Sequence, residues 1–340
     1  MKLGNRISRC QFQQRIAERW EHIYLFFWRR DFLFLSGGVI LLNSKNLCQK
    51  LNNREFVVTV EMSTPKGADI SNSIEEARKL YGIVDALNIT DCPMANMRMS
   101  PIALAHLLQN HLNIETIFHL TCRDRNLIGL QAELLGAYAL GVRNILALTG
   151  DDPKRGDVPQ ATGVYDVDSI GLIKIAKSLN NGFDYSGNRL ESSTSFCIGT
   201  TANPNDLSKE SIEKLKIKIE NGASFIQTQP VYDEKILYRF LDAISKFGIP
   251  VLVGVLPLKS YKMAVNLNAK VPGIEIPDYI LERLKNNGKG EGLKIAVEFI
   301  NKIKNLVSGV HIMPLGRTDI VVDIINNVKN IKTDIKKEVL

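Results

Sequence analysis

The sequence of 340 residues predicts an α/β protein built as a (β/α)8 barrel, the TIM-barrel fold. Eight short segments rich in Val, Ile and Leu recur along the chain, and amphipathic helical patterns separate them. Polar residues follow these segments directly, as they do in barrels whose sites lie at the carboxyl ends of the strands. The chain is also long enough to bury the core of one such barrel.

The strand candidates are short, apolar and rich in β-branched residues, which favour extended backbone. The first of them, Phe56-Val-Val-Thr-Val-Glu61, follows this pattern closely. Strands that alternate with helices form right-handed βαβ units and a parallel sheet, and eight such units close the sheet into a barrel. We expect strands at residues 56–61, 84–89, 115–120, 143–148, 195–200, 224–229, 250–255 and 309–313.

The segments between the strands carry helical patterns, in which apolar residues recur every three or four positions. Residues 256–308 differ because prolines interrupt them, and we expect regular helix there only from about residue 291. Either Asp206 or Ser208 can cap the helix that follows the fifth strand. We expect helices at residues 44–52, 74–82, 100–111, 126–141, 167–180, 208–221, 232–247, 291–306 and 317–329.

Residues 1–43 differ in composition from the rest of the chain, because they hold both tryptophans and many phenylalanines among basic residues. Their apolar run, residues 32–42, is shorter than the roughly 20 residues that a membrane-spanning helix needs. This N-terminal extension is either a peripheral membrane or partner-binding segment, a weakly ordered extension, or upstream sequence from a misplaced start codon. We expect residues 44–335 to form the barrel, with any membrane contact confined to residues 1–43.

The positive charge is concentrated near the amino terminus, where residues 1–50 hold nine Lys or Arg and three Asp or Glu. Because the whole chain has a formal net charge of +7, the predicted barrel is nearly neutral, and we expect no nucleic-acid partner. The five cysteines are scattered and form no CxxC pair, which argues against a zinc site and against a disulfide framework. A reducing, cytoplasmic location is the simplest interpretation.

The residues that follow the predicted strands are polar, and in a barrel they would meet at one mouth, as a small-molecule site requires. Asp151 could instead only cap a turn, because Gly-Asp and Asp-Pro pairs are common in turns. His119 could equally be a histidine of the core. The candidate residues at the mouth are Glu61, Thr90, His119, Asp151, Asn203, Gln229, Tyr261 and Arg317.

Several common site motifs are missing from the sequence. No phosphate-binding GxxxxGK[ST] loop occurs, and no GxGxxG motif follows a predicted strand, so neither a P-loop nor a Rossmann site is predicted. No HExxH motif and no cluster of His and Cys indicates a metal site, so we expect no metal.

Several longer motifs occur together in one order along the chain. They are Glu61 after a Val-rich strand, His119-Leu-Thr-Cys122, Leu148-Thr-Gly-Asp151, Gly222-Ala-Ser-Phe-Ile-Gln-Thr-Gln229 and Gly254-Val-Leu-Pro-Leu258. With these motifs, the chain over about residues 44–335 resembles the methylenetetrahydrofolate reductase family. It is most similar to the reductase half of bacterial proteins that are fused to a homocysteine methyltransferase, although the methyltransferase half and its zinc-binding cysteines do not occur here.

The resemblance implies a flavoprotein with a (β/α)8 fold that reduces 5,10-methylenetetrahydrofolate to 5-methyltetrahydrofolate in one-carbon and methionine metabolism. NAD(P)H would reduce the flavin, FAD or FMN, before the folate takes its place. By the same resemblance, Glu61 matches the general acid and Asp151 the carboxylate near the flavin and pterin. Gln229, Tyr261 and Arg317 match substrate-side positions. The positions that match flavin contacts are Thr90, His119, Gly150, Asp151, Tyr165, Asn203 and Lys218.

Two departures from the family leave alternatives open. Thr149 stands where the best-known members have arginine, and Asn203 where they often have histidine, so the choice between FAD and FMN stays open. A protein partner could supply electrons in place of NAD(P)H, within a redox-partner complex or a homo-oligomer. A pterin- or corrinoid-linked methyl-transfer barrel without flavin is the alternative from a different enzyme class.

Overall fold

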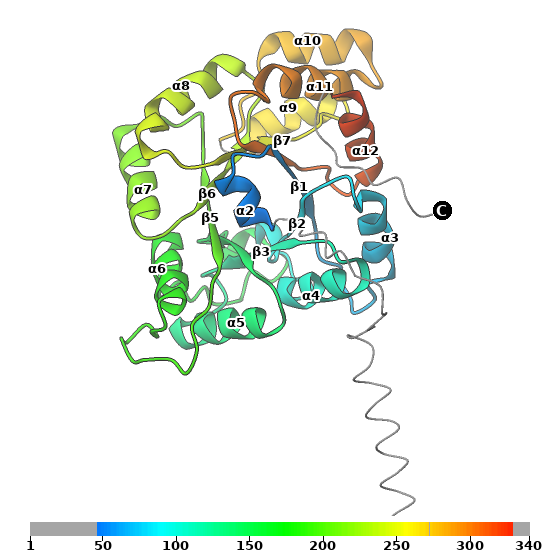
Figure 1. The fold of residues 1–340 in the computed structure, drawn as a ribbon. Coiled ribbons are helices and arrows are strands. Elements are labelled where there is room, and N and C mark those ends of the chain that lie inside the picture. Colours follow the sequence, from blue (N-terminus) through cyan, green and yellow to red (C-terminus); the bar gives the residue numbers. More distant parts are fainter. Residues whose placement is uncertain (1–45, 272, 329–340) are drawn as a thin grey trace, which may run out of the picture. The chain divides into compact units, whose positions relative to one another are not determined.

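The computed structural model describes residues 46–271 and 273–328, which contain a closed barrel of eight parallel strands in sequence order (Figure 1). All eight strand predictions are confirmed, with bounds that differ by two residues at most. The predicted (β/α)8 architecture is therefore correct. The strands are β1 (Val57–Met62), β2 (Ala86–Ile89), β3 (Thr116–Thr121), β4 (Asn144–Leu148), β5 (Cys197–Ala202), β6 (Phe225–Pro230), β7 (Val251–Val255) and β8 (Gly309–Ile312).

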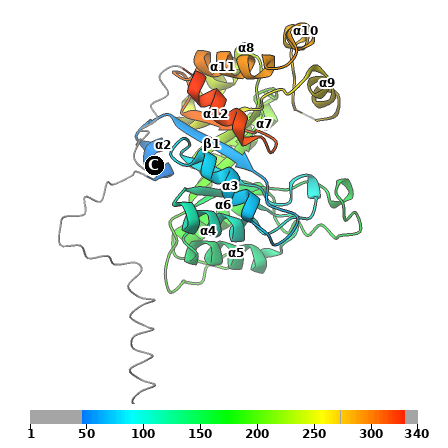
Figure 2. The same ribbon diagram turned by 90° about the vertical axis from the view of Figure 1, so that its right-hand side faces the viewer.

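Helices surround the barrel on all sides (Figures 1 and 2). Ser208, one of the two predicted candidates, caps the helix after β5 by accepting a hydrogen bond from the Ser211 amide. The helices are α2 (Leu47–Asn52), α3 (Ser71–Leu80), α4 (Pro101–Leu112), α5 (Leu127–Ala139), α6 (Ser169–Asn180), α7 (Lys209–Glu220), α8 (Glu234–Ile244), α9 (Tyr261–Lys270), α10 (Asp278–Asn287), α11 (Glu291–Ile303) and α12 (Thr318–Asn327).

The prediction for residues 256–290 was wrong, because α9 and α10 lie there. Ser260 caps α9 by accepting a hydrogen bond from the Met263 amide at 3.2 Å. Pro277 stands at the N-cap of α10. A proline just before a helix is compatible with helical backbone, so it marks the start of α10 and does not interrupt a helix. Both helices pack with α11 on an apolar cluster that includes Leu256 and Leu258, after β7.

The inward-facing residues at the amino-terminal ends of the strands form an apolar layer. Leu47 and Leu51 of α2 pack onto this layer and cover this end of the barrel. Phe225 fills much of the space because the neighbouring position is Gly199, where a Cβ atom would lie 2.4 Å from the Phe225 ring. The layer comprises Val57, Ala86, Ile117, Leu146, Cys197, Phe225 and Leu252.

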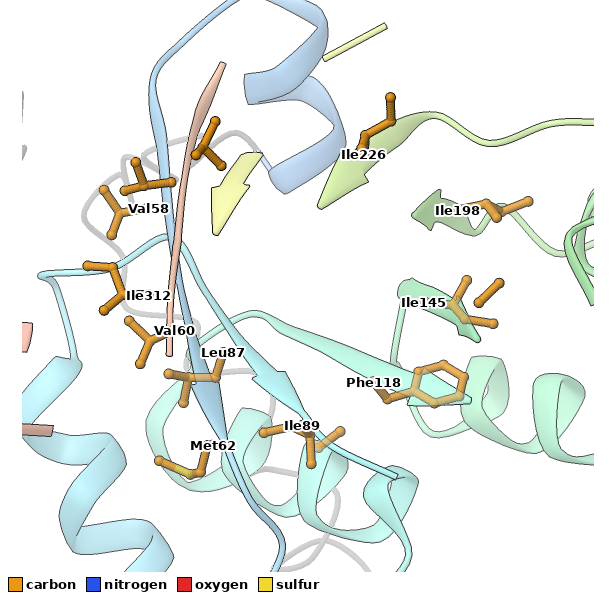
Figure 3. Packing of buried hydrophobic residues seen from close by; sticks show 14 of the residues in the cluster. Val58, Val60, Met62, Leu87, Ile89, Phe118, Ile145, Ile198, Ile226 and Ile312 are labelled. Atoms are coloured by element: carbon orange, nitrogen blue, oxygen red, sulfur yellow. The ribbon is translucent and has the colours of Figure 1, made fainter. Parts of the chain in front are cut away.

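The outward-facing residues of the same strands form the main core between the barrel and its helices. Because strand side chains alternate between two faces, Val58, Val60 and Met62 of β1 point outward (Figure 3). Leu87 and Ile89 of β2 do the same. With both faces of each strand buried, the strands are apolar almost throughout, which is the signal that made them predictable.

Residues 1–45, and with them the predicted extension 1–43, lie outside the described part of the chain. Within the described ranges, no helix is both long enough and apolar enough to cross a membrane.

Candidate active site

Glu61 stands near the carboxyl end of β1, in register with Asn88 of β2. Its side chain is only partly exposed, and burial raises the pKa of its carboxyl group to about 7. No Lys or Arg within the described ranges forms an ion pair with it. A glutamate that is enclosed but unpaired holds its proton near neutral pH, which is the property that a general acid needs.

Asp151 lies in the loop after β4 and connects this loop to the loop after β2. Its carboxylate accepts a hydrogen bond from the Met94 amide at 3.0 Å, and Tyr165 donates its hydroxyl to the Asp151 carbonyl at 2.8 Å. The neighbouring Asp152 caps the short helical turn by accepting from the Lys154 amide at 2.9 Å. The turn-capping role that was the alternative for Asp151 therefore belongs to Asp152.

Gly150 allows the chain to turn sharply before Asp151. Its φ is +97°, in the region that favours glycine, and a Cβ atom there would lie 2.9 Å from the Arg123 Cβ. Substitution at Gly150 would therefore displace both the loop and the Arg123 side chain packed against it.

A buried ion pair supports the same side of the mouth. Asp91 accepts hydrogen bonds from the amide and the hydroxyl of Thr121, both at 2.9 Å, and forms an ion pair with Arg125 at 2.8 Å. These groups fix the carboxyl ends of β2 and β3 relative to each other. Asp91 directly follows a predicted strand in the sequence. Its pairing with Arg125 could not be predicted, because 34 residues separate the two.

A cavity of about 180 Å³ opens beside β5 and α7. Asn203 and Lys218, two predicted flavin contacts, both line it. Lys218 is buried and donates a hydrogen bond to the Thr201 carbonyl at 3.0 Å, and burial lowers its pKa to about 8. The polar lining includes the cations Lys218 and Lys214, the Asn203 amide and the Asp206 carboxylate, a set that suits a polar ligand with an anionic group.

Thr90 ends the β2 segment with a buried hydroxyl group that has no hydrogen-bond partner in the described structure. A buried polar atom without a partner is costly, and a ligand that accepts its hydrogen bond would remove the cost.

The predicted substrate-side residues lie at the ends of β6, β7 and β8 and are more exposed. Gln229 is exposed on β6, Tyr261 begins α9 with 39% of its surface exposed, and Arg317 precedes α12. Among the residues that the structure describes, Arg317 forms an ion pair only with Asp319, at 3.3 Å. The three side chains share one end of the barrel, but no hydrogen bond joins them to one another.

Below the mouth lies a layer of neutral polar residues, of which only His119 was predicted as a site residue: Thr59, Asn88, His119, Gln227 and His311. All five are buried, and a continuous set of hydrogen bonds joins them. We call these five residues the buried polar layer. The sequence signal was present, because Asn88 and Gln227 interrupt otherwise apolar strands, but only the closed barrel shows that they meet.

No group of three or more His, Cys, Asp or Glu side chains within the described ranges is arranged to hold a metal ion.

The fold and the site together define a (β/α)8 barrel whose carboxyl-end mouth carries an unpaired acid and a second carboxylate, with a polar cavity beside β5 and α7. The model of the family "Methylenetetrahydrofolate reductase" matches residues 46–329. The chain belongs to this family.

Curated relatives carry the same name. Methylenetetrahydrofolate reductase 1 of Schizosaccharomyces pombe is 27% identical over 68% of this chain, and the match covers 40% of that protein. The chain thus spans less than half the length of this relative. The 5,10-methylenetetrahydrofolate reductase of Buchnera aphidicola is 24% identical, and the match covers 81% of this chain and 90% of that protein.

A solved structure from Clostridium thermocellum, described as an uncharacterized protein that binds two copies of 5-methyl-5,6,7,8-tetrahydrofolic acid, has the same fold. The TM-score is 0.58 at 17% identity, over 83% of this chain and 97% of that one.

Proposed function

We propose that the protein is a flavin-dependent reductase that converts 5,10-methylenetetrahydrofolate to 5-methyltetrahydrofolate, with NAD(P)H as the source of hydride. It would be a cytoplasmic enzyme of one-carbon metabolism that supplies methyl groups for methionine. The observation that carries the proposal is Glu61, a mouth carboxyl group that is unpaired and has a pKa raised to about 7, in a chain of this family.

The proposed role of Glu61 follows from the chemistry of the substrate. The five-membered ring of methylenetetrahydrofolate must open before its one-carbon unit can accept hydride, and opening requires a proton on the departing nitrogen. Glu61 would give up this proton and become a carboxylate, while the substrate becomes an iminium ion. Hydride addition to the iminium carbon then gives the methyl group. An ordinary glutamate is ionised at neutral pH and would have no proton to give.

The residues at the mouth fit a flavin. The unpartnered Thr90 hydroxyl would donate to an acceptor atom, and the cavity lined by Asn203 and Lys218 would hold an anionic or polar part of the cofactor. Gly150 lets the loop that carries Asp151 pack closely against Arg123 and Thr121, which holds this side of the mouth in place. When bound, the flavin supplies the hydride transfer, and the protein contributes binding and orientation. We favour FAD, with FMN as the alternative.

The remaining site residues would bind the folate. The Asp151 carboxylate, held by the Met94 amide, can accept hydrogen bonds from the donor edge of a pterin. Gln229, Tyr261 and Arg317 would contact the rest of the substrate from the opposite side of the mouth. Arg317 is exposed, and its one ion pair within the described part of the chain is with Asp319, so its guanidinium remains able to bind a carboxylate.

The names of two relatives include a nicotinamide cofactor, but they differ in which one. The Caenorhabditis elegans relative is named for NADPH, and the Oryza sativa relative for NADH. We therefore propose NAD(P)H for this chain.

The test is an absorbance titration of the purified full chain with added FAD or FMN, followed anaerobically by NADH, NADPH and methylenetetrahydrofolate. We expect a bound flavin that a nicotinamide bleaches and the folate restores. A flavin that only a chemical reductant bleaches, yet folate restores, would move the electron source to a protein partner. Failure to bind either flavin would contradict the proposal and favour the methyl-transfer alternative.

A further inference from the structure

The buried polar layer crosses the barrel from β3 to β8. Asn88 and Gln227 form a reciprocal amide pair at its centre: Asn88 Nδ2 donates to Gln227 Oε1 at 2.8 Å, and Gln227 Nε2 donates to Asn88 Oδ1 at 3.2 Å. Each amide has a second N–H group. That of Asn88 faces His119 Nε2 at 3.0 Å, and that of Gln227 faces the Thr59 hydroxyl oxygen at 3.3 Å.

With the two amides oriented as they are in the structure, the pair sets the direction of the hydrogen bond to His119. Reversal of both amides together would give the opposite direction, so the direction follows from this orientation. The Asn88 oxygen is already turned toward a Gln227 N–H group, so only an Asn88 N–H group can meet His119 Nε2. His119 Nε2 is therefore an acceptor. In a neutral imidazole the other nitrogen, Nδ1, then carries the proton.

The direction of the hydrogen bond between Thr59 and His311 follows in the same way. The Thr59 oxygen accepts from Gln227, and the only other polar atom that the described structure places near its hydroxyl is His311 Nδ1, at 3.0 Å. If the hydroxyl did not donate to Nδ1, a fully buried O–H group would be left without an acceptor, at substantial cost. His311 Nδ1 is then an acceptor, and its ring proton lies on Nε2.

Both histidines are neutral at physiological pH. Burial lowers the pKa of His119 to about 4, although Asp91 opposes this shift, and burial together with His119 lowers the pKa of His311 to about 3. The Asn88 and Thr59 side chains are fully buried, so the bonds that they make to the two rings are shielded from water.

We propose that the Asn88–Gln227 amide pair acts as a positioning device that holds His119 and His311 in opposite neutral tautomers, with the proton on Nδ1 of His119 and on Nε2 of His311. His119 thereby becomes a fixed N–H donor beside the mouth. What this tautomer does for a bound flavin rests on the proposed function. The His119 Nδ1–H group can donate a hydrogen bond to an acceptor atom of the cofactor, whereas Nδ1 of the opposite tautomer cannot.

The tautomers can be measured without any ligand. The chain has five histidines, so long-range proton–nitrogen NMR of the full chain, labelled with ¹⁵N at the imidazole rings, gives a spectrum that single His→Gln substitutions can assign. We expect the Nδ1–H pattern for His119 and the Nε2–H pattern for His311 at pH 7. An Nε2–H pattern for His119, an Nδ1–H pattern for His311, or rapid exchange between tautomers in either ring would overturn the proposal.

Selective substitutions sharpen the test. Thr59→Val keeps the side-chain shape and removes the Thr59 bonds to His311 and to Gln227, while the Asn88 bond to His119 is left in place. The His311 pattern should therefore change while the His119 pattern stays. Asn88→Leu should change the His119 pattern. The matched control is Thr200→Val, which removes a buried hydroxyl that has no partner in the described structure, and it should leave both patterns unchanged. If Asn88→Leu left the His119 pattern unchanged, the amide pair would not be the positioning device.

The cofactor measurement separates this inference from the proposed function. Asn88→Leu should weaken flavin binding by about three- to tenfold, the effect of one hydrogen bond, while Thr200→Val should not. Wild-type protein that shows the expected tautomers but binds no flavin would refute the proposed function and leave the positioning device standing. Flavin binding by a protein with the opposite tautomers would refute the positioning device and leave the proposed function standing.

Discussion

The two ends of the barrel are built from the same strands, yet the side chains inside them have opposite chemistry. Along β1 the inward-facing residues run from Val57 through Thr59 to Glu61. Along β6 they run from Phe225 through Gln227 to Gln229. Each of these two strands thus passes from an apolar side chain to a neutral polar one and then to a polar residue at the mouth, in steps of two residues.

This difference assigns the two ends separate tasks. The amino end is closed by α2 and filled by Phe225, so its contribution is stability. The carboxyl end is open and carries Glu61, whose raised pKa means that the folded protein pays a free-energy cost to keep an unpaired acid there. The comparison predicts that changes at the amino end affect stability alone, whereas changes at the mouth affect chemistry and can even stabilise the fold.

The largest change in stability should come from Phe225→Ala. Removing a buried ring from a packed layer costs about 3–5 kcal/mol of unfolding free energy. Urea denaturation measures the loss. In the protein that remains folded, the rate of the folate reaction should be nearly normal, because the mouth lies at the other end of the barrel.

Phe225→Leu is the control, and it should cost clearly less because it leaves a smaller void. If Phe225→Ala lowered the unfolding free energy by less than about 1 kcal/mol, or if the folded variant had no folate activity, the two ends would not have separate roles.

At the mouth, Glu61→Gln should stabilise the protein at high pH. Because the pKa of Glu61 is about 7 in the folded protein and lower in the unfolded chain, raising the pH ionises the unfolded state first and weakens the fold. The penalty is absent below the unfolded pKa and complete above about pH 7. Its size is about 3 kcal/mol, at 1.36 kcal/mol for each pH unit. The variant should gain this stability at pH 8 and progressively less toward pH 4.5.

Glu298→Gln is the matched control, because the Arg283 side chain lowers the pKa of Glu298. This variant should gain no stability at pH 8. Equal stability of wild type and Glu61→Gln at every pH would mean that the Glu61 carboxyl group is not desolvated.

The smallest effect should come from Tyr165→Phe, which removes the hydroxyl bond to the Asp151 carbonyl. One neutral hydrogen bond contributes about 0.5–1.5 kcal/mol, so unfolding free energy should fall by that amount, with weaker folate binding as the Asp151 loop loosens. Tyr238→Phe, at an exposed tyrosine of α8, should change neither quantity. If both variants behaved alike, the Tyr165 bond would not position the loop.

The sequence was sufficient for the strands and for the acids that follow them, because alternation and strand ends are local patterns. It failed for α9 and α10, where Pro277 precedes a helix that we had expected prolines to interrupt. The pairing of Asn88 with Gln227 could not be predicted from the sequence either, because 139 residues separate them and only closure of the barrel brings them together. Whether Glu61 had a cationic partner likewise depends on residues that are remote in the sequence.

The central claim is that Glu61 donates the proton that opens the folate ring, and half-reactions of wild type and Glu61→Gln test it most directly. Stopped-flow absorbance would follow flavin reduction by NAD(P)H and then flavin reoxidation by methylenetetrahydrofolate, each between pH 5.5 and 9. Reduction by NAD(P)H should be similar in both proteins. Folate reoxidation should fall by about 10²- to 10⁴-fold in the variant.

In the wild type, folate reoxidation should also decline as the pH rises above about 7, since only protonated Glu61 can act, and the variant should lack this decline. A variant that is reoxidised by folate at the wild-type rate, with the wild-type pH dependence, would contradict the account.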